Sequence, residues 1–395
     1  MRPALVIPSY WEGDAHDSPA TASYDHTTSL NAPTYELDRC LASLEQVRGI
    51  SRIIVLVVCP LSVTAAVTQR VERICEVHPS LKVTLVTNDE ATRIMDRVSQ
   101  LAPHASGEGV SLRGYGAIRN MGLAVASILG HDAVVFLDDD EVALGPDFME
   151  KALFGLNQET RQRLPIIAKS GFFYDREGSP LADTTKAGIT HRWWTKRIEF
   201  NRWMKRALAG TRISRSNHVC GGCLALSARA SMRVAFDPFI TRGEDLDYLF
   251  NLRLLGYEMW FDNQWSVRHL PPRSTERSGR FLQDVHRWYY ERAKLAFAAR
   301  LKEYNQVTPA SLMPYPGPWL TGQLDERVRK TALVRAVFTH EHREYWAVWR
   351  RGRADAERYA RENAHRYLQF QSFWPSIMNG LWADAELAAM LERRT

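Results

Sequence analysis

The stretch AVVFLDDDEV, residues 133–142, places five apolar residues directly before four consecutive acids. An apolar run of this length is typical of a strand that is buried on both faces. Carboxylates at the end of such a strand are costly to bury unless a positive charge lies beside them. We therefore expect a cation or a basic group at this point.

Asp138 and Asp140 form an Asp-x-Asp pair just beyond this run. In an extended chain, side chains two positions apart point the same way, so both carboxylates can face one ligand. Oxygen ligands suit Mg²⁺ and Mn²⁺, and Mg²⁺ commonly shares its coordination shell with substrate phosphates. The alternative is a solvated turn whose acids cap the segment that follows.

Aliphatic runs at residues 4–8, 52–60 and 81–87 have the same character as the run at 133–137. Apolar residues recur at helical spacing between these runs, so strand and helix alternate four times. This alternation predicts an α/β fold with a mostly parallel sheet and flanking helices. The ligand site of such a sheet lies beyond the carboxyl ends of its strands, where the acids stand.

Two polar stretches interrupt the alternation and are predicted to be insertions in one large domain, residues 1–275. The first, at about residues 11–36, lacks periodicity and is long enough to suggest a functional loop beside the site. The second, at about residues 183–218, is rich in Arg, Lys and Trp. Residues 276–395 are helix-like and are expected to form a helical C-terminal region.

The composition narrows the class of protein. The chain has 395 residues, and its formal charge of +6 comes from 51 basic and 45 acidic residues, an excess that does not indicate nucleic-acid binding. Five cysteines, an odd number, argue against a disulfide framework and for a reducing compartment. Because we find no signal sequence and no apolar run of about 20 residues, we expect a soluble cytoplasmic protein. The oligomeric state is left open.

Two further motifs carry polar groups suited to chemistry. A glycine-rich turn in LRGYGAIRNMGLAVASILGHD, residues 112–132, opens a helix with Arg119, and such a helix start can hold phosphate oxygens. The motif GEDLD, residues 243–247, begins another helix. Thr241 and Glu244 have the spacing of a capping box, which gives Glu244 a structural explanation that Asp245 lacks.

The order of these motifs resembles the nucleotide-diphospho-sugar glycosyltransferases of the GT-A fold, and family 2 most of all. The matching pieces are IPSY (7–10), GAIRNMGLA (116–124), VVFLDDDE (134–141), GGCLALSARA (221–230), FDPFITRGEDLDYLFNLRLLGYEMWF (236–261) and VRH (267–269). Each piece is weak alone, but the ordered set, covering roughly residues 3–272, is specific.

The resemblance implies a role for each matching residue. Asp140 would bind Mn²⁺ or Mg²⁺ directly, and Asp138 and His269 would complete the metal shell. The donor site would comprise Pro8, Ser9 and Tyr10 at the nucleoside, Arg119 near base or phosphate, Asp138 and Asp139 near ribose and sugar, and Gly221 and Gly222 beneath the sugar.

Asp245 matches the family's catalytic base, and Glu244 beside it is the second candidate catalytic carboxylate. A hydroxyl becomes a good nucleophile when a nearby carboxylate takes its proton, while the metal neutralises charge on the departing diphosphate. The implied function is transfer of a sugar from a nucleotide-diphospho-sugar to the hydroxyl of a carbohydrate or small acceptor. The anomeric carbon is inverted if Asp245 lies opposite the leaving group.

Alternative functions stay open. VLVVCPLS, residues 55–62, lacks the aspartate that contacts the nucleobase in the family, so the base is not identified. In lacking this aspartate and in having a helical tail, the chain also resembles the mannosylglycerate synthases, which are retaining GT-A enzymes. Nucleotidyltransferases of this fold carry a glycine-rich signature that SYWEGDAHD, residues 9–17, lacks. The last alternative is a non-catalytic basic binding module on a degenerate transferase core.

Two features have both a structural and a functional interpretation. Residues 191–218 could form a packed helix with a basic outer face, a lid whose tryptophans (Trp193, Trp194 and Trp203) stack on sugar, or a segment in peripheral contact with a membrane.

Cys220 and Cys223 form a C-x-x-C pair without a second pair at zinc-finger spacing. Packing by small side chains is therefore favoured over zinc or redox chemistry.

Overall fold

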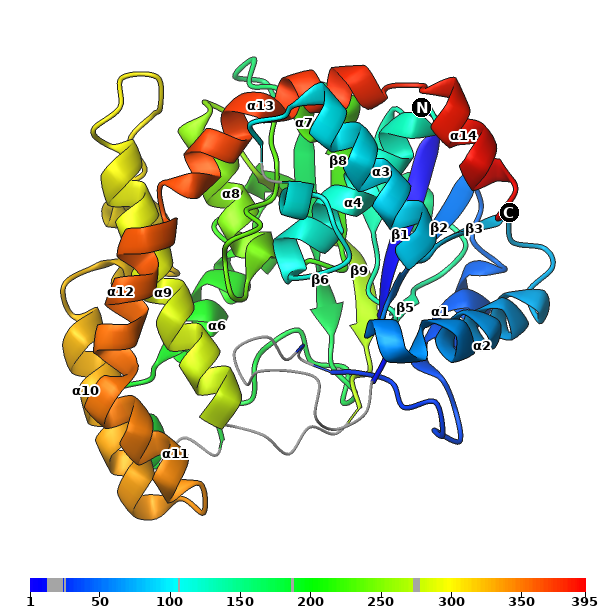
Figure 1. Ribbon diagram of the computed structural model, residues 1–395. Coiled ribbons are helices and arrows are strands. Elements are labelled where there is room, and N and C mark those ends of the chain that lie inside the picture. The colour runs from blue at the N-terminus through cyan, green and yellow to red at the C-terminus, as the bar shows by residue number, and fades with distance from the viewer. Residues whose placement is uncertain (13–23, 25, 106, 186–187, 273–277) are drawn as a thin grey trace.

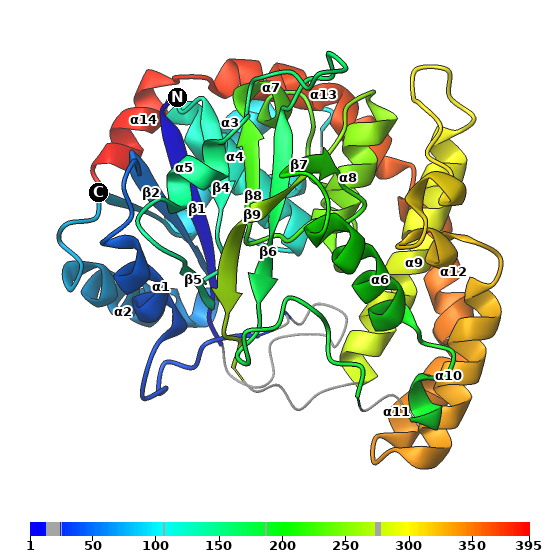
Figure 2. The ribbon, with the colours of Figure 1, turned by 180° about the vertical axis from the view of Figure 1, so that it is seen from behind.

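The computed structural model describes residues 1–12, 24, 26–105, 107–185, 188–272 and 278–395. These residues form a nine-stranded sheet with helices on both faces and a further layer of helices beside it (Figure 1, Figure 2). Of the insertion predicted at about residues 11–36, residues 13–23 and 25 lie outside the described residues.

The first four strands form the parallel half of the sheet. They are β1 (Pro3–Tyr10), β2 (Arg52–Val58), β3 (Val83–Val86) and β4 (Ala133–Phe136), in the order β3-β2-β1-β4. They coincide with the four aliphatic runs and are buried throughout, as predicted. Their carboxyl ends meet at one edge of the sheet, so the end of β1 and the acids after β4 lie together.

The second half makes the sheet mixed. It contains β5 (Glu141–Ala143), β6 (Ala168–Tyr174), β7 (Ile213–Arg215), β8 (Leu224–Ser227) and β9 (Trp260–His269). β8 is antiparallel to β4 and β6, β6 and β9 are parallel, and β5 and β7 are antiparallel to β9. The predicted parallel arrangement therefore holds for β1 to β4 and again for the pair β6 and β9, while the other pairs are antiparallel. An apolar run indicates that a strand is buried, but it does not indicate whether the strand is parallel or antiparallel to its neighbours. A strand covered on both faces is apolar in either case.

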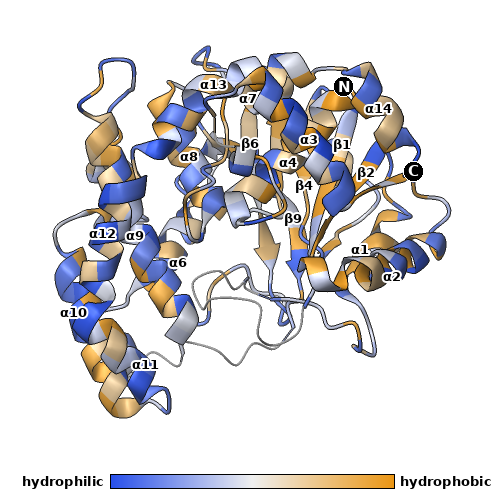
Figure 3. Ribbon diagram, viewed as in Figure 1, coloured by the Kyte–Doolittle hydropathy of each residue, from blue (hydrophilic) through white to orange (hydrophobic). Residues whose placement is uncertain are grey.

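Each face of the sheet packs on its own hydrophobic core. α1 (Glu36–Leu44), α2 (Thr64–Glu76) and α5 (Phe148–Leu153) cover one face, and α3 (Asn88–Leu101) and α4 (Tyr115–Ile128) cover the other. Successive residues of β1 alternate between the cores: Leu5 faces α1, and Val6 faces α4. The contact with α4 is close, because a Cβ on Gly122 would come 2.7 Å from Val6 Cγ1. Figure 3 shows the strands as largely apolar.

The C-terminal region is helical, as predicted. It contains α9 (Ser278–Ala298), α10 (Leu324–Phe338), α11 (His342–Ala347), a π-helical turn (Val348–Gly352), α12 (Arg353–Asn363), α13 (Arg366–Leu381) and α14 (Ala385–Glu392). α9 to α12 form the layer beside the sheet, and α13 and α14 cross back over α3 and α4 (Figure 1). The backbone N–H of Leu85 in β3 donates to the carbonyl of Arg394 at 3.2 Å. The domain boundary at residue 275 stays a prediction.

The basic segment at residues 191–218 contains α6 (Lys196–Leu208). The Trp203 ring lies 5.2 Å from the Phe261 ring, and the Trp194 ring lies 4.6 Å from that of Trp319. Both tryptophans are buried. Because these rings already pack inside the protein, the structure favours the packed helix over a lid that stacks on sugar. No helix within the described ranges has the length and apolar character to span a bilayer, and peripheral membrane contact stays a prediction.

Cys220 and Cys223 precede β8, which leads into the short helix α7 (Ala228–Ser231). Both cysteines are free and buried, and burial raises the pKa of each thiol well above its ordinary value. A thiol that stays neutral packs as a small apolar group. The geometry therefore agrees with the packing interpretation of this pair.

A buried charge network joins α9 to α8 (Glu244–Leu254). Lys294 Nζ donates to Asp237 Oδ2 and to Asn251 Oδ1, each at 2.9 Å, and it also pairs with Asp247. All four side chains are 0% exposed. Burial lowers the pKa of Lys294, but the two carboxylates outweigh burial and raise it, so the ammonium stays charged. This network fixes the C-terminal region against the helix that carries Asp245.

Removing the cation of this network should destabilise the fold. We expect Lys294→Met to lower the free energy of unfolding by about 3–5 kcal/mol, because Asp237 and Asp247 would remain buried without a counter-charge. Urea unfolding followed by tryptophan fluorescence measures the change. Lys330→Met is the matched control and should change stability little, since Lys330 pairs with Glu326 on the surface. Equal effects of the two substitutions would contradict the assignment.

Candidate active site

The acids at residues 138–141 form a turn that links β4 to β5, at the carboxyl edge of the parallel strands. Asp139 and Asp140 are both 0% exposed, and Glu141 is 2% exposed. Among the described residues, basic side chains reach this turn from three distant segments: the loop after β1, helix α4 and the end of β9. They supply the positive charge that the sequence required.

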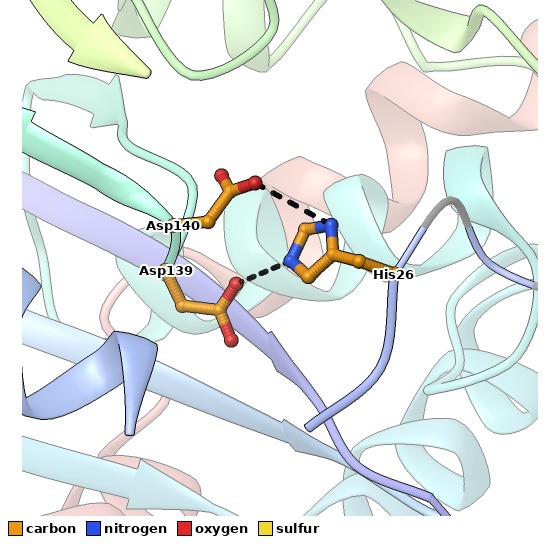
Figure 4. Close-up of side chains that lie close together, drawn as sticks. All are labelled: His26, Asp139 and Asp140. Carbon is orange, nitrogen blue, oxygen red and sulfur yellow. Dashed lines mark hydrogen bonds and ion pairs between the residues drawn. The ribbon is translucent and has the colours of Figure 1, made fainter. Parts of the chain in front are cut away.

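His26 lies between Asp139 and Asp140 (Figure 4). Its Nε2 is 3.0 Å from Asp139 Oδ1, and its Nδ1 is 3.5 Å from Asp140 Oδ2. Burial lowers the pKa of His26, but the hydrogen bond to Asp139 and the charges of the acids outweigh burial and raise it to about 10. With no metal bound, the imidazole is therefore protonated at neutral pH. It would have to release this proton to bind a metal ion.

His26 was not among the predicted site residues. It belongs to the polar stretch at about residues 11–36, which was predicted to be a functional loop beside the site. Nothing in that stretch distinguishes one polar residue from another, because it has no periodicity. The sequence therefore signalled the loop but not the histidine.

His269 reaches Asp140 from the end of β9. Its Nε2 is 3.1 Å from Asp140 Oδ2, and the β5–β9 ladder places it opposite Glu141. Burial raises the pKa of Asp140, but the hydrogen bond from His269 and the two histidine charges outweigh burial and hold this pKa below its usual value. At Asp139 burial dominates and raises the pKa. Neighbouring aspartates therefore have pKa values shifted in opposite directions.

Arg119 projects from α4 and joins two acids. Its Nη2 donates to Asp138 Oδ1 at 2.8 Å, and its Nε donates to Glu244 Oε1 at 3.3 Å. The guanidinium is 4% exposed, and its Nη1 has no hydrogen-bond partner among the described residues. Burial raises the pKa of Glu244 to about 7 despite the charge of Arg119. One nitrogen of Arg119 thus remains available for a ligand.

Gly221 and Gly222 lie where no side chain would fit. A Cβ on Gly222 would come 1.8 Å from Glu141 Oε2, and one on Gly221 would come 2.9 Å from Arg119 Nη2. The same Cβ on Gly221 would lie 3.6 Å from Asp245 Oδ2. The two glycines therefore let the acidic turn, Arg119 and Asp245 approach one another.

Asp245 stands in the first turn of α8. Its side chain is half-buried, and its Oδ1 accepts from the Leu246 N–H at 2.6 Å. The cap of this helix is Gly243, without a side-chain hydrogen bond, so the capping box expected from Thr241 and Glu244 does not form. The structural reason is that Glu244 turns toward Arg119, while the Thr241 hydroxyl donates to the Gln283 carbonyl at 3.4 Å.

The residues expected at the nucleoside lie at the end of β1. The Tyr10 backbone N–H donates to Asp139 Oδ2 at 3.3 Å, and Ser9 Oγ accepts from Trp11 Nε1 at 3.0 Å. The ring of Tyr10 packs 4.5 Å from that of Tyr24. Pro8 to Tyr10 are thus beside the acidic turn, and their donor-binding role stays a prediction.

The acidic turn offers a ligand set that fits a divalent cation. His26, Asp139 and Asp140 each supply one ligand atom, and these atoms lie within 4.8 Å of one another. Asp140 Oδ1 is buried without a hydrogen-bond partner among the described residues, as expected of an oxygen that binds a metal. His269 contacts the other oxygen of Asp140. Asp138, also predicted as a ligand, accepts from Arg119 through Oδ1, and its role as a metal ligand stays a prediction.

A mixed sheet with an acidic turn at its carboxyl edge is the arrangement expected of a GT-A glycosyltransferase. A family model described as "Glycosyltransferase like family 2" matches residues 51–291. The chain belongs to this family. None of the curated proteins compared with the chain matches it.

Several solved structures are similar to this chain. A mannosyltransferase from Pyrobaculum calidifontis, PcManGT, in complex with GDP-Man and Mn²⁺, has 15% identity and a TM-score of 0.45 over 97% of this chain and 88% of its own. A mycobacterial protein has 13% identity and a TM-score of 0.38, over 73% and 72%. GalNAc-T7 with UDP, GalNAc and Mn²⁺ has 12% identity and a TM-score of 0.40, over 85% and 57%.

Asp140→Asn should weaken binding of Mn²⁺ by roughly tenfold or more, because the neutral amide replaces a charged oxygen ligand. Titration of Mn²⁺ followed by electron paramagnetic resonance of the free ion measures the affinity. Asp147→Asn, which alters a carboxylate paired with Lys151 near the surface, is the control and should leave the affinity unchanged. An Asp140→Asn protein that binds Mn²⁺ as tightly as the parent would exclude Asp140 as a ligand.

Proposed function

We propose that this protein is a metal-dependent glycosyltransferase that moves a sugar from a nucleotide-diphospho-sugar to the hydroxyl of a carbohydrate or small hydroxylated acceptor. One observation carries the proposal: Asp140 lies between His26 and His269 at the carboxyl edge of a GT-A sheet. That edge is where α/β sheets bind ligands, and carboxylate oxygens with imidazole suit a divalent cation.

Asp140, Asp139, His26 and His269 would hold the metal, which we propose to be Mn²⁺ or Mg²⁺. When bound, such an ion neutralises charge on the departing diphosphate. Support comes from the unpaired Asp140 Oδ1 and from the 4.8 Å spread of the ligand atoms of His26, Asp139 and Asp140.

The donor would lie between the end of β1 and the loop before β8. We assign Pro8, Ser9 and Tyr10 to the nucleoside, and Asp138, Gly221 and Gly222 to the sugar side. Arg119 would bind a phosphate oxygen through Nη1, the buried nitrogen that has no partner among the described residues. An arginine held in place by two carboxylates suits this role, because its unpaired donor is already oriented.

Asp245 would act as the general base. The acceptor oxygen forms a bond to the anomeric carbon while the bond from that carbon to the diphosphate oxygen breaks. The bonding electron pair leaves with the nucleoside diphosphate, and the hydroxyl proton passes to a carboxylate oxygen of Asp245. Glu244 is less suited, because Arg119 engages its carboxylate and its side chain is buried. A base opposite the leaving group would invert the anomeric carbon.

A screen of UDP-, GDP- and TDP-sugars in the presence of Mn²⁺ tests the reaction class. We expect one donor class to stabilise the protein against heat and to be hydrolysed slowly, and excess EDTA to abolish both effects, because the diphosphate would lose its counter-charge. Differential scanning fluorimetry and release of nucleoside diphosphate are the measurements. Full turnover of the chosen donor in EDTA would contradict metal dependence.

Asp245→Asn should lower the turnover number for sugar transfer by roughly 10²–10⁴-fold while donor affinity changes little, because the amide cannot take the proton. Steady-state transfer kinetics and calorimetric donor titration separate the two effects. Asp89→Asn replaces an exposed aspartate in the first turn of α3 and serves as control. An unchanged turnover number would remove Asp245 from the role of base.

A further inference from the structure

Three polar atoms near Asp245 are not used by the reaction proposed above. Both ring nitrogens of His218 and Nη2 of Arg287 are buried without a hydrogen-bond partner among the described residues. Arg287 is 6% exposed. The ring of Tyr315 lies 6.3 Å from that of His218 and 6.5 Å from that of Trp288, which follows Arg287 on α9. The charge of Asp245 also acts on His218 and Arg287. Leaving buried donors unpaired is costly, which points to a ligand that pairs with them.

These groups come from segments far apart in the sequence. His218 lies in the segment between β7 and β8, and Arg287 belongs to α9. The guanidinium of Arg287 lies against the start of α8, since a Cβ on Gly243 would come 2.0 Å from its Cζ. Arg287 is thus brought to the base by helix α9, which follows the motifs quoted for the family resemblance.

His218 is held in a wall of aromatic rings. Its ring lies 4.9 Å from that of Phe200, 5.6 Å from Trp203 and 6.3 Å from Tyr315. Burial lowers the pKa of His218 to about 4. The neutral imidazole therefore offers one donor and one acceptor, a combination that suits a hydroxyl group.

Three basic side chains lie on the side of Arg287, each beside a carboxylate. Lys196 Nζ and Arg242 Nη1 share Asp284, at 2.6 Å and 3.5 Å respectively. Arg287 donates through Nε to Glu291 Oε1 at 3.0 Å. Burial raises the pKa of Glu291 despite the charge of Arg287. Nη2 of Arg287 remains beyond this pair, and an anionic group would supply its partner.

We propose that His218 and Arg287 form an acceptor site beside Asp245, and that this site takes a hydroxylated acceptor that carries a carboxylate or phosphate group. Arg287 binds the anionic group through Nη2, and His218 binds a hydroxyl. The anionic group thereby fixes the orientation of the acceptor and brings another of its hydroxyls to Asp245. The inference rests on the proposed function, because it assigns the acceptor side of that reaction.

Direct binding tests the site without the reaction. Calorimetric titrations with glucuronate, glucose 6-phosphate and glucose are carried out in EDTA, so that no metal ion holds the anions. We expect at least one anionic sugar to bind roughly tenfold or more tightly than glucose, as a charge-assisted hydrogen bond predicts. The tighter of the two identifies the anionic group as carboxylate or phosphate. Equal affinities for all three sugars would overturn the proposal.

The double variant Arg287→Gln with Glu291→Gln removes the guanidinium and its buried partner together, so no carboxylate is left unpaired. It should lose the roughly tenfold preference for the anionic sugar. Arg292→Gln, on the same helix and paired with Asp325, is the matched control and should keep the preference. His218→Phe keeps the aromatic wall and should weaken binding of neutral and anionic sugars alike. A preference that survives in the double variant would refute the role of Arg287.

The two proposals fail in different ways. If the parent protein hydrolyses no nucleotide-diphospho-sugar but binds an anionic sugar in a manner that requires Arg287, the proposed reaction fails and the site stands. If the protein transfers sugar equally well to glucose and to the anionic sugars, and the double variant does the same, the reaction stands and the acceptor assignment is wrong.

Discussion

Compensation of the buried acids at residues 138–141 is the constraint on which the rest of the structure depends. Carboxylates that are buried at the end of a strand need counter-charges, and in this protein separate parts of the chain supply them. His26 and His269 meet at Asp140, while Arg119 binds Asp138. Each counter-charge therefore fixes the position of a different segment: the loop after β1, the last strand and helix α4. The same convergence leaves Asp140 Oδ1 unpaired, which makes the acidic turn suited to a cation.

A second set of buried charges performs a related task on the other side of the candidate site. Lys294 holds α9 against α8, and Arg287 on the same helix reaches the start of α8 near Asp245. The helical C-terminal region thus packs directly against the helix that carries the proposed base. Because α13 and α14 return to cover α3 and α4, the region also contributes to the core on that face of the sheet.

Much of the fold was predictable, because a strand that is buried on both faces has a continuous aliphatic sequence. The aliphatic runs became β1 to β4, and the helices between them lie where apolar residues recur. The antiparallel orientation of β8 was not predictable, since a buried strand is apolar whether it runs parallel or antiparallel to its neighbours. The capping box at Thr241 and Glu244 was wrong because a distant arginine competes for Glu244, and local spacing carries no information about Arg119.

The sequence by itself determined the α/β sheet, the acidic turn at its edge and the need for positive charge there, because these follow from local hydrophobicity and from the cost of burying carboxylates. Only the tertiary structure decided which groups meet that need. His26 lies in a stretch without periodicity, and Arg287 lies beyond the motifs that carried the resemblance in the sequence, although the family match over residues 51–291 includes it. Contacts such as His26 with Asp139, which are 113 residues apart, arise when the chain closes long loops around a common core.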